Sequence, residues 1–188
     1  YNQIKENISK FQKNFIKTKP LICFAVKANN NIRILKEIGK LGLGADVVSK
    51  GELLAALKSK IKPKKIVFSG VGKTYQEIEF AAKKKVLLIN AESQSEIETI
   101  LKIARKVNRV IDIGIRLNPN VDAKTIKEIT TGKTINKFGL TEKEVIGLIN
   151  HYKKSKYLNI KCLSVHIGSQ ITSHIPYLKM LKAIQKII

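Results

Sequence analysis

The chain alternates short, almost continuously apolar runs with longer stretches whose apolar residues recur every three or four positions. The runs LICFAV, KIVF and VLLI have the composition of parallel strands that are covered on both faces. The stretch Ile32–Leu41 is apolar at positions 32, 34, 35, 38 and 41, which predicts an amphipathic helix. The predicted strands are Leu21–Lys27, Ala45–Ser49, Lys65–Ser69, Val86–Asn90, Val110–Asn118 and Ile160–His166.

Four predicted helix starts carry a capping signal, in which a Ser or Thr is followed three residues later by Glu. The hydroxyl accepts a hydrogen bond from the backbone amide of the Glu, and the carboxylate reaches back to the amide of the capping residue. Each signal follows a strand-like run or a loop, which supports the order of the predicted elements. The pairs are Ser49 with Glu52, Thr74 with Glu77, Ser93 with Glu96 and Thr141 with Glu144.

The strand-like runs recur at the spacing of repeated βα units, which indicates an α/β fold with parallel strands. An open doubly wound sheet and a (β/α)8 barrel both fit this alternation. Six βα units are visible in 188 residues, whereas an eight-unit barrel takes about 250 residues. We therefore predict one domain over residues 1–188, a TIM-type barrel that is truncated after about six βα units. Tyr1 also opens the sequence without an initiator Met, so we expect a missing start.

The formal net charge is +22, which raises the alternative of a basic nucleic-acid-binding domain. Only four of the 36 basic residues are arginines, the lysines are spread over every segment, and aromatic residues make up 6% with no Trp. A phosphate-binding surface favours clustered bases, arginine and stacking aromatics, so solvated helix faces explain the lysines better. We expect no specific nucleic-acid partner, and only weak DNA binding at low salt.

The sequence also indicates where in the cell the protein works. No apolar run approaches ~18 residues, so we expect no membrane-spanning segment. The start shows no secretory signal, which favours the cytoplasm. Cys23 and Cys162 lie inside apolar strand-like runs, so we expect two buried free thiols.

Polar residues gather where the predicted strands end. In both candidate folds, ligands bind at the carboxyl ends of the strands, so these residues mark the expected site. A lysine, an acid, an arginine and a histidine at one rim form a candidate chemical constellation. The residues at these ends are Lys27, Asp46, Ser69, Arg116, Asn118, His166 and Ser169.

Lys27 ends an apolar strand and is followed by Ala28 and three asparagines. A lysine that is desolvated there presents a neutral amine able to form a Schiff base. The alternative is a strand-end lysine whose charge reaches solvent, which is common in a chain this rich in lysine. Position alone leaves both interpretations open.

His166, Ser169 and Arg116 each allow a functional and a structural interpretation. Beside a reactive lysine, the imidazole of His166 packs on a cofactor ring or moves protons; otherwise it is structural. Ser169 follows a glycine at a strand-to-helix turn, where its hydroxyl and nearby amides can hold a phosphate. The guanidinium of Arg116 needs acceptors, which come from an anionic ligand or from a structural acid.

One segment imitates a nucleotide-binding motif. FSGVGKT, residues Phe68–Thr74, follows a predicted strand and opens a predicted helix, as a P-loop does. The P-loop pattern requires a glycine five residues before Gly72, and that position is Val67. The loop is too short to wrap a phosphate, so nucleotide hydrolysis is disfavoured.

Segments spread over the whole chain resemble those of the fold-type III pyridoxal-phosphate (PLP) decarboxylases, and within that family the diaminopimelate decarboxylases. FAVKANN is similar to the family's cofactor-lysine motif YAVKAN, and GADVVSKGEL is similar to its GADVVSGGEL. The GVGKT, VDAKT and NKFG pieces favour diaminopimelate over ornithine or arginine as substrate. The other similar segments are KIVFSGVGKT, LINAES, RLNPNVDAKT, TGKTINKFG and SVHIGSQIT.

The resemblance implies a PLP enzyme that decarboxylates meso-2,6-diaminopimelate to L-lysine, the last step of lysine biosynthesis. It implies that Lys27 forms a Schiff base with PLP and that His166 stacks on the pyridine ring. Ser169 then contributes to the phosphate site, while Asp46 and Arg116 line the floor beside the lysine and the ring. It further implies a cytoplasmic protein with an amino-acid substrate, and a homodimer at full length.

This sequence departs from the family's pattern at three positions, and other parts of the pattern come later in the family than these 188 residues. Lys50 stands in place of a glycine, Phe24 in place of a tyrosine and Asn120 in place of an aspartate, and none of these removes a residue named above. The glycine-rich phosphate loop, the acid that pairs with the pyridine nitrogen and the substrate-binding Arg, Tyr and partner-subunit Cys all come later in the family. We therefore expect that these 188 residues alone neither retain PLP well nor decarboxylate.

Two alternatives stay open within this resemblance. Besides diaminopimelate decarboxylation, the chain could come from a non-catalytic PLP-binding relative of the same barrel, or from a decarboxylase for ornithine, arginine or carboxynorspermidine. The polar segment Asn118–Gly139 is long for a βα connection, and we interpret it as a lid that folds over the site.

Overall fold

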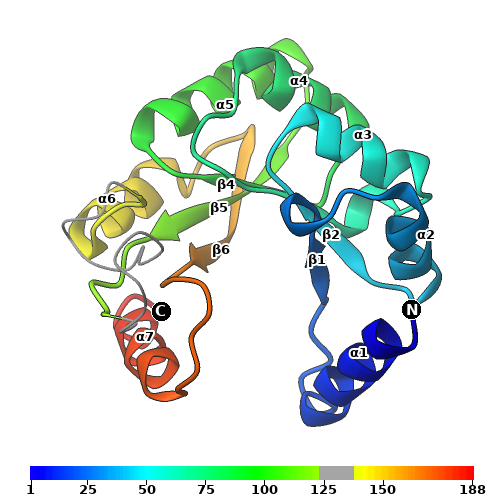
Figure 1. Ribbon diagram of the computed structural model, residues 1–188. Coiled ribbons are helices and arrows are strands. Elements are labelled where there is room, and N and C mark those ends of the chain that lie inside the picture. Colours follow the sequence, from blue (N-terminus) through cyan, green and yellow to red (C-terminus); the bar gives the residue numbers. More distant parts are fainter. Residues whose placement is uncertain (123–137) are drawn as a thin grey trace.

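The computed structural model describes residues 1–122 and 138–188, and it consists of alternating strands and helices (Figure 1). The strands are β1 Cys23–Ala25, β2 Gly44–Val47, β3 Ile66–Phe68, β4 Leu88–Ala91, β5 Ile111–Leu117 and β6 Leu158–Val165. The helices are α1 Asn2–Asn14, α2 Ile32–Lys40, α3 Lys50–Lys58, α4 Tyr75–Lys84, α5 Gln94–Lys106, α6 Glu142–Tyr152 and α7 Ile175–Gln185, with 3-10 turns at Val26–Ala28 and Pro63–Lys65.

The six strands form one parallel sheet in the order β1-β2-β3-β4-β5-β6. A doubly wound sheet reverses its strand order at a switch point, whereas a barrel keeps adjacent strands in chain order. The sheet curves, and helices α2 to α6 lie along its outer side (Figure 1). The structure therefore confirms the predicted barrel with six βα units.

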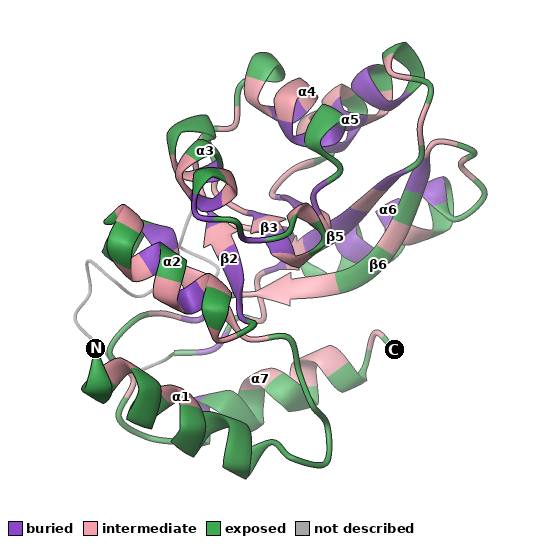
Figure 2. Cartoon of the chain, turned by 90° about the vertical axis from the view of Figure 1, so that its right-hand side faces the viewer, coloured by how far each residue is buried: buried purple, intermediate pink, exposed green. Residues whose placement is uncertain are grey.

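The core lies between the strands and the inward faces of the helices. Ile66, Phe68 and Ile89 of β3 and β4 are 0% exposed, and they pack with fully buried helix residues such as Leu53 and Ile97. Burying one such side chain contributes roughly 1.5–3 kcal/mol to stability. Buried positions fill most of the central strands β2 to β5 and one stripe of each central helix, whereas the edge strands β1 and β6 and the helices α1 and α7 are more exposed (Figure 2).

The four capping signals divide into two types in the structure. Thr74 and Thr141 form complete capping boxes, as predicted. Ser49 and Ser93 also accept from the backbone amides of Glu52 and Glu96, but those carboxylates bind one residue further back, at the amides of Val48 and Glu92. The prediction that the carboxylate reaches the capping residue itself is therefore wrong at Ser49 and Ser93. Their backbone is more extended (φ −153° and −154°) than that of Thr74 and Thr141 (φ −76° and −68°).

The cysteine prediction is half right. Both thiols are free, Cys23 is half-buried, and Cys162 is exposed rather than buried. Cys162 lies on β6, an edge strand that β5 covers along one side only, and this position accounts for its exposure.

Two further predictions concern membranes and the lid. No helix in residues 1–122 or 138–188 is both long and apolar enough to cross a membrane. Most of the predicted lid, residues 123–137 of the segment Asn118–Gly139, lies outside the described residues.

Gly44 sits where three strands approach closely, and this position provides a test of the packing. A methyl group there would overlap the carbonyl oxygen of Lys65 and lie 2.7 Å from Sγ of Cys23. We expect Gly44→Ala to lower the free energy of unfolding by about 3 kcal/mol, because a backbone carbonyl cannot move aside.

The matched control is Gly147→Ala on the exposed face of α6, where nothing lies within 4 Å of the added methyl. This substitution should raise the free energy of unfolding by about 0.5–1 kcal/mol, the helix preference of alanine over glycine. Chemical denaturation of the two variants measures both values, and a neutral Gly44→Ala would contradict the strand packing.

Candidate active site

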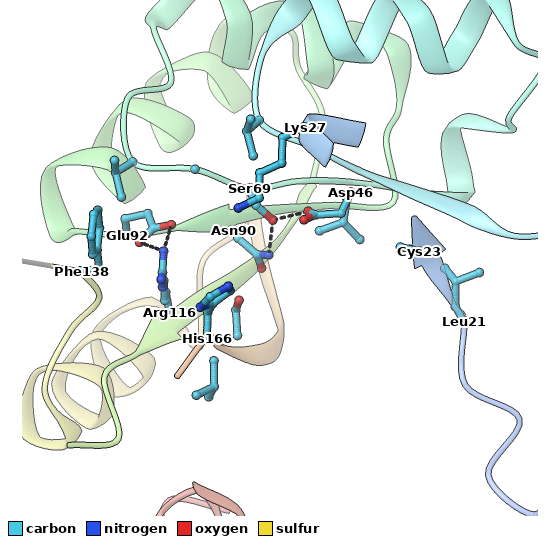
Figure 3. Close-up of a pocket in the computed structure, with 16 residues that line it drawn as sticks. Leu21, Cys23, Lys27, Asp46, Ser69, Asn90, Glu92, Arg116, Phe138 and His166 are labelled. Atoms are coloured by element: carbon cyan, nitrogen blue, oxygen red, sulfur yellow. Dashed lines mark hydrogen bonds and ion pairs between the residues drawn. The ribbon is translucent and has the colours of Figure 1, made fainter. Parts of the chain in front are cut away.

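A cavity of about 740 Å³ opens at the carboxyl ends of the strands. Each of the six strands, or the turn that follows it, contributes a polar residue to its lining (Figure 3). Sequential parallel pairing explains this arrangement, because it brings all the strand ends to one rim. In strand order the contributed residues are Lys27, Asp46, Ser69, Asn90, Arg116 and His166.

The structure brings together four of the five predicted site residues, namely Lys27, Asp46, Arg116 and His166. Ser169 is exposed beyond the turn after β6 and is not among the residues that line this cavity, so its phosphate role stays a prediction. Asn118 lines a separate cavity of about 290 Å³ at the start of α6.

Lys27 is placed by the turn that ends β1. The strand stops at Ala25, and the 3-10 turn Val26–Ala28 buries Val26 while it directs Lys27 into the cavity. The side chain extends towards Ser69 (Figure 3). The lysine itself is exposed, so of the two interpretations left open the described residues show the one in which its side chain reaches solvent.

Asp46 accepts a hydrogen bond at the floor of the cavity. The Ser69 hydroxyl donates to Asp46 Oδ1 at 2.5 Å, and Asn90 Nδ2 donates to Ser69 Oγ at 3.0 Å. Burial raises the pKa of Asp46, while the Ser69 hydrogen bond and the charges of Lys27, His166 and Arg116 lower it. The upward effect dominates, so this carboxyl titrates above the usual range for aspartate.

Arg116 is paired with Glu92, a residue that the sequence reasoning did not single out. Arg116 Nη1 lies 2.8 and 2.9 Å from the two carboxylate oxygens, and the two side chains are 13% and 7% exposed. The guanidinium also lies 5.4 Å from the ring centroid of Phe138. The acceptor is therefore a structural acid, one of the two alternatives, although the position of Glu92 just after a predicted strand was a usable signal.

His166 follows β6 and faces the cations of the cavity. Desolvation lowers the pKa of His166, and the positive charges of Arg116 and Lys27 lower it further. The imidazole is therefore mainly neutral at pH 7, in the form that packs on an aromatic ring without the cost of burying a charge.

The thiol of Cys23 lines the same cavity near Asp46. Burial raises the pKa of Cys23 to about 11, with a smaller contribution from the charge of Asp46. The thiol is consequently protonated at neutral pH, and a protonated thiol is a poor nucleophile.

Lys73, the lysine of the segment that resembles a P-loop, has a structural role. Its side chain is 0% exposed, and its ammonium lies 2.8 Å from Oε1 of Glu96 and also donates to the carbonyl of Gly70. The lysine thus binds the protein's own loop and the start of α5, which agrees with the rejection of a nucleotide site. Gly70 and Val71 of this loop line the cavity.

The sequence is similar to a known family and to named proteins over almost its whole length. The family model described as "Pyridoxal-dependent decarboxylase, pyridoxal binding domain" matches residues 1–188. Diaminopimelate decarboxylase of Helicobacter pylori strain J99 is 45% identical over 187 residues, which are 100% of this chain and 46% of that protein. The Aquifex aeolicus enzyme of the same name is 41% identical over 187 residues, 100% of this chain and 43% of that protein.

Solved structures give the same result. The crystal structure of the Helicobacter pylori diaminopimelate decarboxylase complexed with L-lysine matches with a TM-score of 0.96 and 44% identity, over 99% of this chain and 47% of that chain. A viral arginine decarboxylase matches with a TM-score of 0.81 at 20% identity, covering 99% of this chain and 47% of that chain, and shows the fold alone. The chain thus spans about half the length of the relatives that it matches.

The buried ion pair of Lys73 provides a test of how the cavity wall is held. We expect Lys73→Met to lower the free energy of unfolding by about 3 kcal/mol, because the carboxylate of Glu96, 11% exposed, loses its cation. Lys83→Met is the control, since Lys83 pairs with Glu79 on an exposed helix face and its loss should leave stability unchanged within error. Equal effects of the two substitutions in thermal or urea unfolding would contradict this account.

Proposed function

The chain belongs to the pyridoxal-dependent decarboxylases, through their pyridoxal-binding domain, and we propose that the full-length protein decarboxylates meso-2,6-diaminopimelate to L-lysine with PLP carried on Lys27. The observation that carries this proposal is the convergence of Lys27, Asp46, Arg116 and His166 on one cavity. The choice of substrate rests on relatives named diaminopimelate decarboxylase that are 40–45% identical to this chain.

The residues present fit PLP in their chemistry. The cofactor has an aldehyde, which needs an amine, and an aromatic ring, which needs a flat apolar or neutral partner. Lys27 provides the amine and the neutral imidazole of His166 provides a ring face, in a cavity whose volume suits a small molecule. Asn90 Oδ1 is also buried without a hydrogen-bond partner in the described chain, as is common where a ligand or water completes a site.

Each cavity residue then has a definite task. PLP, when bound, supplies an electron sink for the electron pair that the departing carboxylate leaves behind. The Lys27 amine would hold the cofactor, and, once free, it would lie beside the reacting carbon as a group able to transfer a proton. The Asp46 carboxyl accepts the Ser69 hydrogen bond and interacts electrostatically with that amine, and Glu92 holds Arg116 in the cavity lining.

Several finer expectations belong to the same proposal. We propose that residues 1–188 form one PLP-binding barrel domain, that Ser169 contributes to the phosphate site, and that the full-length protein is a homodimer. A cytoplasmic location is supported by two free thiols, which are typical of a reducing compartment. The absence of a specific nucleic-acid partner stays a prediction.

Other amino-acid decarboxylations are less well supported. Arginine decarboxylase shares the fold at 20% identity, and a lysine decarboxylase from Selenomonas ruminantium shares it at 21%. At this level of identity, neither similarity indicates which substrate this protein uses. A non-catalytic PLP-binding relative would keep Lys27 and the fold, so turnover by the full-length protein separates that alternative from the enzyme.

Borohydride fixation tests the assignment of Lys27. We expect reduction of the full-length protein with PLP to fix the cofactor on the peptide that contains Lys27, because this is the lysine that reaches into the cavity. Lys27→Arg should abolish the labelling, whereas Lys36→Arg, on the exposed face of α2, should not change it. Label on a different lysine would refute the assignment.

Turnover tests the substrate. The full-length protein should release CO₂ from meso-diaminopimelate with a kcat/KM at least about 100-fold above that for ornithine or arginine. Lys27→Arg should lower kcat by a factor of 10² or more, on the order expected for loss of a covalent and acid–base group. A preference for ornithine or arginine in this assay would reject the substrate but leave the family intact.

A further inference from the structure

Three side chains from adjacent strands form a hydrogen-bonded series across the cavity floor. Asn90 of β4 donates to Ser69, which follows β3, and Ser69 donates to Asp46 of β2 (Figure 3). The strand register places them side by side. Asp46 pairs with Val67, two residues before Ser69, and Phe68, the residue before Ser69, pairs with Ile89, the residue before Asn90. We call these three residues the floor series.

The direction of donation in the floor series is fixed by chemistry. A serine hydroxyl has one hydrogen, and at 2.5 Å that hydrogen is directed to Oδ1 of Asp46. The Ser69 oxygen is then left as an acceptor, and the Asn90 amide supplies the donor at 3.0 Å. Each donor points towards Asp46, so the series stabilises the ionised carboxylate.

The far end of the floor series is held rigidly. Asn90 is 7% exposed, and its Oδ1 lies against Gly114 of β5 so closely that a methyl group at Gly114 would overlap it. The amide is therefore packed against the neighbouring strand on its Oδ1 side, which limits its rotation. Asn90 is thus an anchor that fixes the Ser69 oxygen, which in turn fixes Asp46.

We infer that Ser69 and Asn90 are positioning residues, which hold the Asp46 carboxylate charged and in one orientation beside the Lys27 amine. Without these donors, burial would favour the neutral acid, and the carboxyl would be free to rotate. The groups that face Asp46 are Lys27, Arg116, His166 and the thiol of Cys23, and three of them are cations or become cations. The inference rests on the proposed function only in the meaning it gives to Lys27 as the cofactor lysine.

The test is a carboxyl titration of the full-length protein without cofactor. With ¹³C-labelled aspartate, the Asp46 signal is identified by its loss in Asp46→Asn. Ser69→Ala should make Asp46 about tenfold weaker as an acid, a rise of about one pKa unit, because one hydrogen bond to the charged form is lost. Ser69→Thr keeps the hydroxyl and should restore the original titration.

Two further variants separate positioning from general damage. Ser59→Ala removes another buried serine hydroxyl, one outside the cavity lining, and should leave the Asp46 titration unchanged. Asn90→Leu should raise the pKa of Asp46 in the wild-type background and have no additional effect in the Ser69→Ala background, because Asn90 acts through Ser69. Lys27→Met should also raise it, and its effect should add to that of Ser69→Ala, since the lysine acts directly on the carboxylate.

The outcomes are decisive. A folded Ser69→Ala protein with an unchanged Asp46 titration overturns the positioning role, as do additive effects of Asn90→Leu and Ser69→Ala. An unchanged titration in Lys27→Met overturns the placement of Asp46 beside that amine. Because the titration uses protein without cofactor, borohydride labelling of a different lysine would count against the proposed function and not against the floor series.

Discussion

Parallel pairing of the strands in chain order is the constraint on which the rest of this structure depends. It forces each connection to cross the outside of the sheet as a helix, and it brings all six carboxyl ends to one rim. Two glycines make the close pairing possible, Gly44 between β1 and β3 and Gly114 between β4 and β6. Residues far apart in the sequence thereby become neighbours in a single cavity.

Charged groups at the rim are balanced by partners rather than by solvent. Arg116 in the cavity lining pairs with Glu92, and Lys73, in the loop whose Gly70 and Val71 line the cavity, pairs with Glu96. Lys27 and His166 are left facing Asp46, whose carboxylate is stabilised by Ser69 and Asn90. A cavity organised in this way presents an amine and a neutral ring in a defined electrostatic field, which is what a pyridoxal cofactor requires.

Much of the fold and part of the site followed from local sequence patterns. Apolar runs with polar ends located every strand, and their ends identified Lys27, Asp46, Arg116 and His166 because strand ends converge in parallel folds. The sequence did not identify Glu92 and Asn90 as site residues. An acid before a helix has the pattern of a helix start, and an asparagine after an apolar run has the pattern of a strand end. Their roles depend on which side chain lies on the next strand, and that is set by register, which a single sequence does not contain.

The carboxylate of Glu96 has a consequence for how this protein can change over evolutionary time. One oxygen binds Lys73 and the other accepts from the backbone of Glu92, whose own side chain holds Arg116. Loss of either the lysine of the GVGKT segment or the glutamate at the start of α5 would leave a buried, uncompensated charge in the other, so we expect changes at the two positions to be tolerated only together. The lysine of a segment that resembles a nucleotide-binding loop thus has a structural role that does not involve nucleotides.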